Sequence, residues 1–225
     1  LKRLEYRGYD SAGVSIMNGK GVETRKAKGK ISQLEAALRA SPVDGNVGIA
    51  HTRWATHGPP NECNAHPHHD CTGTVSVVHN GIIENYGPLR AMLQKTGHTF
   101  VSDTDTEVLA HLIESAMDGN LEEAVIDALA LVEGTYGIAV ISSKDPDKIV
   151  AARKGSPLLI GLGDEPGEYY VASDVAAILQ HTRQVVYLDD GEMAVLSRTG
   201  YQVMDLDAQI VKKGVSRIEW DLDQI

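Results

Sequence analysis

Cysteine is scarce in this sequence: only Cys63 and Cys71 carry a thiol among 225 residues. Two cysteines do not form the dense disulfide framework of a small secreted domain, so we expect a reducing compartment, the cytoplasm. No apolar run reaches the roughly 20 residues that a membrane-spanning helix needs. We therefore expect a protein that works without a membrane.

Positive charge is also in short supply. The chain has 21 Lys and Arg against 31 Asp and Glu, and its net charge is -10. The basic clusters, at 25–30 and 212–213, are short. Binding to nucleic acid or to an anionic membrane is driven by a basic surface, so neither partner is expected.

Several motifs of nucleotide and hydrolase chemistry are missing. The sequence has no G-x-S-x-G nucleophile elbow, no phosphate-binding P-loop and no G-x-G-x-x-G fingerprint. A dinucleotide or nucleoside-triphosphate enzyme is therefore poorly supported, and we expect no cofactor.

The first half of the chain mixes strand and helix patterns. Residues 1–8 resemble the end of a helix capped by Gly8 in the left-handed conformation, which suggests residues upstream. Thr104 to Glu107 match a capping box, and Asn120 suits a helix N-cap. The expected strands are 12–17, 22–27, 47–51 and 75–80, the last breaking at Gly81, and the expected helices are 31–40, 85–96, 104–117 and 121–132.

The second half is mainly strand. Turn signals such as Asp145-Pro146 and Asp190-Gly191 separate short apolar runs. Many strands around a central helical block indicate an α+β fold with substantial antiparallel sheet, and we expect one domain over residues 1–225. The strand candidates are 137–142, 148–153, 158–162, 168–172, 185–188, 192–197 and 201–204, with one helical stretch at 174–180.

The segment from Cys63 to Cys71 is the densest group of potential metal ligands, with two thiols and three imidazoles in nine residues. Structural zinc sites usually combine ligands from two separated segments. No second half is evident elsewhere in the sequence, so we expect no metal. A disulfide between the two thiols is also not expected in a reducing compartment.

Polar groups at three strand ends suit a free amino acid. Arg53 offers the planar fork that a carboxylate prefers, and Asp105 offers a carboxylate for an ammonium group. Asn80 and the backbone N–H of Gly81 could stabilise the oxyanion formed when a side-chain amide is attacked. The alternatives are ordinary: a surface ion pair for Arg53, a favourable charge at a helix N-terminus for Asp105, and a turn at 80–81.

Four sequence motifs resemble those of a particular family. H-T-R-W-A-T-H-G (51–58), N-A-H-P-H (64–68), H-N-G-I-I-E-N (79–85) and S-D-T-D-T-E (102–107) resemble the glutaminase domain of the glutamine–fructose-6-phosphate amidotransferases, the glucosamine-6-phosphate synthases. The resemblance extends to 5–13, 155–158 and 172–174, in order along nearly the whole chain.

This resemblance implies a four-layer αββα N-terminal-nucleophile hydrolase fold with two stacked antiparallel sheets. It also implies a mechanism in which the thiol of an N-terminal cysteine attacks the amide of L-glutamine, with its own α-amine as general base. Residues 1–225 lack that cysteine and the first strand of the family, so this polypeptide by itself is expected to be inactive.

The resemblance implies a role for each of several residues of this sequence. Arg53 would bind the glutamine carboxylate, Asp105 its ammonium with help from Gly81, and Asn80 with Gly81 would form the oxyanion hole. Further implied roles are flanking contacts for Thr56 and His57, gating of ammonia by Trp54, support near the nucleophile by Arg7, and structural hydrogen bonding by His51, His66 and His79.

The resemblance implies partners as well: L-glutamine and L-glutamate, a covalently linked sugar-phosphate isomerase domain that is absent from these residues, and a homodimer at full length. The glutaminase halves of amidophosphoribosyltransferase and asparagine synthetase are less similar, because W-A-T-H (54–57) and His66 are not typical of them. A non-enzymatic interaction module with the same fold remains an alternative, favoured if the natural protein begins at Leu1.

Overall fold

The computed structural model describes residues 1–219 and centres on a six-stranded antiparallel sheet in the order β12-β11-β7-β6-β5-β4. Buried residues lie on both faces of this sheet, as expected for a sheet that is covered on both sides. They are β4 (His68–His69), β5 (Val75–Ile83), β6 (Gly134–Ser142), β7 (Asp145–Lys154), β11 (Glu192–Ser197) and β12 (Gly200–Asp205).

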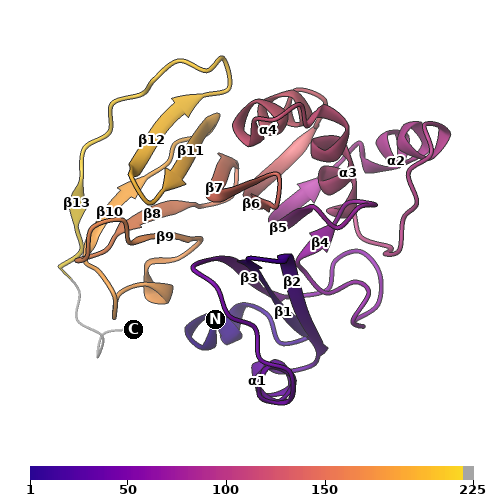
Figure 1. Cartoon of the computed structure of the whole chain (residues 1–225), viewed down its shortest axis with the longest axis horizontal. Coiled ribbons are helices and arrows are strands. Elements are labelled where there is room, and N and C mark those ends of the chain that lie inside the picture. The colour runs from indigo at the N-terminus through magenta and orange to yellow at the C-terminus, as the bar shows by residue number, and fades with distance from the viewer. Residues whose placement is uncertain (220–225) are drawn as a thin grey trace.

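Helices cover one face of this central sheet (Figure 1). Val77, Ile138 and Val140 point to that face and pack with apolar residues of the helices in the largest core cluster. Burial of this apolar surface is the main force that holds the two layers together. The helices are α2 (Tyr86–Lys95), α3 (Glu107–Ala116) and α4 (Leu121–Leu129).

Two smaller antiparallel sheets cover the other face. Met17 and Ile49 pack on Val78 and Ile141 of the central sheet, which places the sheet β2-β1-β3 there. Residues of β8 and β10 pack on β7 and β11 in a separate cluster, which places the sheet β13-β10-β8-β9 on the same side. The strands are β1 (Ser11–Asn18), β2 (Gly21–Lys28), β3 (Val47–Arg53), β8 (Leu159–Leu162), β9 (Tyr169–Ala172), β10 (Gln184–Tyr187) and β13 (Ser216–Arg217).

A second helical layer is carried by α1 (Ile31–Ala40) and by a short 3-10 helix, η2 (Val175–Ala177). Ile31 and Leu34 of α1 bury against Ala12 and Ala27 of the β1/β2 hairpin. The layers therefore run helix, sheet, sheet, helix, as expected for a four-layer αββα fold with stacked antiparallel sheets.

Two predictions about glycines were wrong. Residues Lys2–Arg7 form a 3-10 helix, η1, and Gly8 has an extended backbone (φ -176°), not a left-handed one. A Cβ on Gly8 would lie 2.7 Å from the carbonyl carbon of Arg53, so glycine is needed there for a close approach to β3. Strand β5 also does not break at Gly81, because its pairing with β6 continues to Ile83.

The expected capping box at 104–107 does not form. Helix α3 begins after Thr106, which makes no side-chain cap hydrogen bond. Glu107 instead accepts from the backbone N–H groups of Val101 and Ser102, each at 2.8 Å. The cap of α4 is as expected, since the side chain of Asn120 accepts from the N–H of Glu123.

No helix within residues 1–219 is long and apolar enough to cross a membrane.

Candidate active site

A cavity of about 470 Å³ lies between the central sheet and the two smaller sheets. Strands β3 and β9 border it, while β5 and β6 contribute to its wall. Seven of the eight residues expected at the site line this cavity: Arg7, Arg53, Trp54, Thr56, Asn80, Gly81 and Asp105. Segments that are far apart in the sequence thus meet at one place.

Arg53 is a buried cation that uses only part of its hydrogen-bonding capacity. It ends strand β3 and is 3% exposed. Its Nη2 donates to the carbonyl oxygens of His57 and Gly58, whereas Nη1 has no hydrogen-bond partner. Burial lowers the pKa of the guanidinium, an effect opposed by the carboxylates of Asp10 and Asp105. A buried donor without a partner is costly, so this nitrogen suits an anionic ligand in the cavity.

Asp105 supplies negative charge to the same cavity and is 4% exposed. Its Oδ2 accepts from the backbone N–H of Ile83 at 2.8 Å, which ties the segment before α3 to the end of β5. Its Oδ1 lies 3.9 Å from Nδ1 of His57. One oxygen is thus held by the fold, and the other has acceptor capacity for a cationic group.

The amide of Asn80 is oriented by a histidine. Nε2–H of His51 donates to Oδ1 of Asn80 at 2.8 Å, so the NH₂ group of Asn80 remains available as a donor. Burial lowers the pKa of His51 to about 4, which keeps the ring neutral near pH 7. A neutral ring donates from only one nitrogen, and here that nitrogen faces the Asn80 oxygen.

Other buried histidines form a polar network around His51. The ring of His66 stacks on His51 with centroids 4.3 Å apart, and its Nδ1 accepts from the N–H of His79. The ring of His79 contacts the hydroxyl of Thr106, and that of His68 the hydroxyl of Thr104. Burial lowers the pKa values of His66, His68 and His79, so the network is uncharged. These contacts agree with the expected structural role of His51, His66 and His79.

Gly81 has a backbone conformation that residues with a side chain rarely adopt. Its φ is +133°, and a Cβ there would lie 2.2 Å from the carbonyl oxygen of Thr135 on the neighbouring strand β6. Glycine is therefore required both for the backbone angle and for the close strand approach. The 80–81 pair is part of a strand, and the alternative of an ordinary turn is wrong.

Of the remaining predicted residues, Arg7, Trp54 and Thr56 line the cavity and His57 lies beside it. The ring of Trp54 is 57% exposed and packs edge-on against Tyr9 at a centroid distance of 5.4 Å. His57 does not line the cavity but reaches toward Asp105 and packs against Tyr86. Nη1 of Arg7 donates to the carbonyl and hydroxyl oxygens of Ser173, 3.3 Å away in each case.

Two polar side chains that hold the site together were missed. The carboxylate of Asp10 accepts from the N–H of Ala55 at 2.8 Å and so fixes the start of the 54–58 loop. Asn64 bridges Pro59 and Asp103, since its Nδ2 donates to the first and its Oδ1 accepts from the backbone of the second. Both residues stand in the motifs at 5–13 and 64–68, but spacing along a chain does not reveal contacts between such distant segments.

A fold of stacked sheets with this polar cavity between them is consistent with one class of protein. The chain belongs to the family of glutamine amidotransferase domains, with residues 24–219 matched. Among curated proteins, it is 53% identical over 232 residues to the glutamine–fructose-6-phosphate aminotransferase (isomerizing) of Chlorobaculum tepidum, covering 100% of this chain and 37% of that protein. It is 50% identical over 223 residues to the enzyme of the same name from Clostridium tetani, with coverage of 99% and 36%.

A solved structure gives an independent comparison of the fold. The B. subtilis glutamine phosphoribosylpyrophosphate amidotransferase complexed with ADP and GMP superimposes with a TM-score of 0.74 at 26% identity, over 92% of this chain and 45% of that one. The chain therefore has the amidotransferase fold expected from its sequence. It spans little more than a third of the length of the two curated relatives described above.

Proposed function

We propose that this domain binds L-glutamine and hydrolyses its side-chain amide to glutamate and ammonia. The observation that carries the proposal is the pairing of two buried, opposite charges in one cavity: Nη1 of Arg53 has no partner, and Asp105 faces the same space. Arg53 binds the α-carboxylate of the substrate and Asp105 its α-ammonium. With both ends held, the carboxamide is presented to Asn80 and Gly81.

The chemistry follows from those positions. A thiolate attacks the carboxamide carbon, and the carbonyl oxygen becomes an oxyanion that accepts from the Asn80 amide and the Gly81 N–H. The nitrogen leaves as ammonia after it takes up a proton, and water then hydrolyses the thioester to glutamate. Neither Cys63 nor Cys71 lines the cavity. The proposed nucleophile is the N-terminal cysteine that the resemblance to the amidotransferase family implies.

Ammonia has its own proposed acceptor. The curated relatives are named for fructose-6-phosphate and are longer than this chain. We propose that ammonia passes from the cavity to fructose-6-phosphate on a covalently linked isomerase domain, and that the full-length enzyme is a cytoplasmic homodimer. The exposed ring of Trp54 at the cavity rim suits the gating role.

Arg53→Lys tests the carboxylate site. Lysine keeps the positive charge but loses the two-pronged geometry and the contacts to His57 and Gly58, so the Kd for glutamate should rise about tenfold or more. Calorimetry on the full-length enzyme measures this change. Arg39→Lys, on the exposed face of α1, is the matched control and should leave the Kd unchanged. Unaltered affinity in Arg53→Lys would remove Arg53 from the carboxylate site.

Asp105→Asn tests the ammonium site. Asparagine preserves the shape and an acceptor oxygen for Ile83 but removes the charge. A hydrogen bond to a charged group contributes roughly 1.5–3 kcal/mol, so KM for glutamine should rise about tenfold to a hundredfold. Steady-state glutaminase assays measure KM, and Asp127→Asn on the exposed face of α4 serves as control. A normal KM in Asp105→Asn would contradict the assignment.

A further inference from the structure

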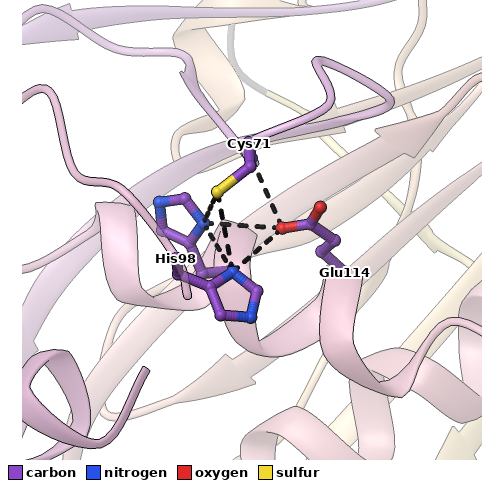
Figure 2. Close-up of side chains that lie close together, drawn as sticks. Cys71, His98 and Glu114 are labelled. Atoms are coloured by element: carbon purple, nitrogen blue, oxygen red, sulfur yellow. Dashed lines mark hydrogen bonds and ion pairs between the residues drawn. The ribbon is translucent and has the colours of Figure 1, made fainter. Parts of the chain in front are cut away.

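A second cluster of chemically reactive side chains lies outside the cavity, where three segments meet (Figure 2). Cys71 comes from the loop between β4 and β5, His98 from the connection between α2 and α3, and His111 with Glu114 from α3 itself. One ligand atom from each of the four lies within 4.8 Å of every other. No second group of ligands for the 63–71 segment is evident in the sequence, but the fold brings three potential ligands next to Cys71.

The spacing of these atoms resembles the edges of a coordination tetrahedron. Nδ1 of His111 lies 3.3 Å from Nδ1 of His98, 3.5 Å from Sγ of Cys71 and 3.6 Å from Oε2 of Glu114. Nδ1 of His98 lies 3.1 Å from the same carboxylate oxygen and 3.7 Å from Sγ. Ligands held about 2.0–2.3 Å from a tetrahedral zinc ion are separated by roughly 3.3–3.8 Å.

The outer nitrogen of His98 has a hydrogen-bond partner. The hydroxyl of Ser115 donates to the carbonyl oxygen of His111, so its 3.0 Å contact with Nε2 of His98 requires the imidazole to donate. The N–H of His98 that contacts Ser115 therefore points away from the cluster, as the ring nitrogen opposite a metal usually does. Nε2 of His111 is buried and lies 3.6 Å from the carboxylate of Glu107, beyond hydrogen-bond distance.

Four potential ligand atoms therefore converge at one place. Nδ1 of His98, a carboxylate oxygen of Glu114 and Sγ of Cys71 lie close together (Figure 2), and Nδ1 of His111 lies within 3.6 Å of all three. We propose that Cys71, His98, His111 and Glu114 form a tetrahedral Zn²⁺ site.

Zinc fits the chemistry of the donors better than a hard cation does. Thiolate and imidazole are ligands of zinc, whereas magnesium and calcium prefer oxygen. A thiolate and a carboxylate together balance the charge of Zn²⁺. His111 is buried, while Cys71 is exposed and gives the ion a path from solvent.

The site connects parts of the chain that hydrogen-bonded strands do not join. It ties the β4–β5 loop and the 96–106 connection to helix α3, and Asp105 of the glutamine site lies just before that helix. The ion thus has a structural role next to the substrate-binding segment. Because it does not contact the cavity, its binding can be measured without glutamine turnover.

Metal analysis of the full-length enzyme, purified after expression with added zinc, tests the site. We expect one Zn²⁺ per chain, lost in Cys71→Ser and in His98→Gln. Cys63→Ser removes the other exposed thiol and His181→Gln an exposed ring outside the cluster, so both controls should retain the zinc. Circular dichroism shows whether each variant is folded. Cys71→Ser is the decisive variant, because Cys71 is exposed.

Cobalt titration supplies a second readout. Co²⁺ added to the metal-free enzyme should give the intense visible bands of a tetrahedral ion and the charge-transfer band of a thiolate ligand, both absent in Cys71→Ser. Ser115→Ala should keep the stoichiometry but weaken Zn²⁺ binding roughly 10–100-fold through loss of the outer contact to His98. A wild-type enzyme that binds no Zn²⁺ or Co²⁺, or binds them as Cys71→Ser does, overturns the proposal.

Discussion

Acidification from pH 7 to pH 5 is expected to destabilise the protein strongly, because it carries buried neutral histidines. Burial lowers the pKa of His51 to about 4 and lowers those of His66, His68 and His79. In the unfolded chain the same side chains titrate near pH 6.5. Between these values only the unfolded chain takes up the protons, so stability falls as the pH falls.

The magnitude follows from linkage. Each proton bound only by the unfolded chain changes the free energy of unfolding by about 1.4 kcal/mol per pH unit. His51 alone then contributes about 3 kcal/mol between pH 6.5 and pH 4, a large part of the roughly 5–15 kcal/mol that stabilises a typical domain. The other three histidines act in the same direction.

Urea unfolding of the 225-residue chain at several pH values measures this slope. Carboxylates with lowered pKa values, such as Glu107, lose their contribution only below about pH 4.5, so the interval from pH 6.5 to pH 5 isolates the histidines. His181→Gln, at an exposed position, should leave the slope unchanged. A free energy of unfolding that is constant from pH 6.5 to pH 5 would contradict the prediction.

Regular elements were predictable because local patterns decide them. Helix 31–40 and strand 192–197 have the expected bounds, since periodic apolar residues and flanking turn residues mark them. The helix expected at 174–180 is only the 3-10 turn Val175–Ala177, capped by Asp174. The two-residue strand β4 was missed, because its histidines pair only with β5 and show no strand pattern of their own.

The partners of the site side chains could not be predicted, because they depend on contacts between distant segments. Asp105 was predicted as the ammonium ligand, but its hydrogen bond to the backbone N–H of Ile83 could not be predicted from the sequence. The cluster of Cys71 with His98 and His111 could not be predicted for the same reason, because these residues meet only after α3 packs beside the β4–β5 loop. Residue types indicated the chemistry, whereas the partner of each side chain required the tertiary structure.

The largest catalytic effect is expected for Asn80→Asp. Aspartate is nearly the same size and retains an oxygen for the Nε2–H of His51, so the hydrogen bond that orients residue 80 survives. The side chain loses its NH₂ donor and gains a negative charge beside the oxyanion. Loss of one well-placed oxyanion donor costs about 2.7–4 kcal/mol, so kcat for glutamine hydrolysis should fall by roughly 10²–10³.

The split between kcat and KM makes this test specific. Arg53 and Asp105 hold the two ends of the substrate and are unchanged, so KM should stay within a few fold of the wild-type value. Asn18→Asp, in the hairpin turn between β1 and β2, keeps the acceptor oxygen for the N–H of Lys20 and should leave both constants unchanged. Stopped-time assays of glutamate release by the full-length enzyme give both values. A kcat that persists in Asn80→Asp, or a loss expressed only in KM, would mean that Asn80 binds the ground state and that the oxyanion is stabilised elsewhere.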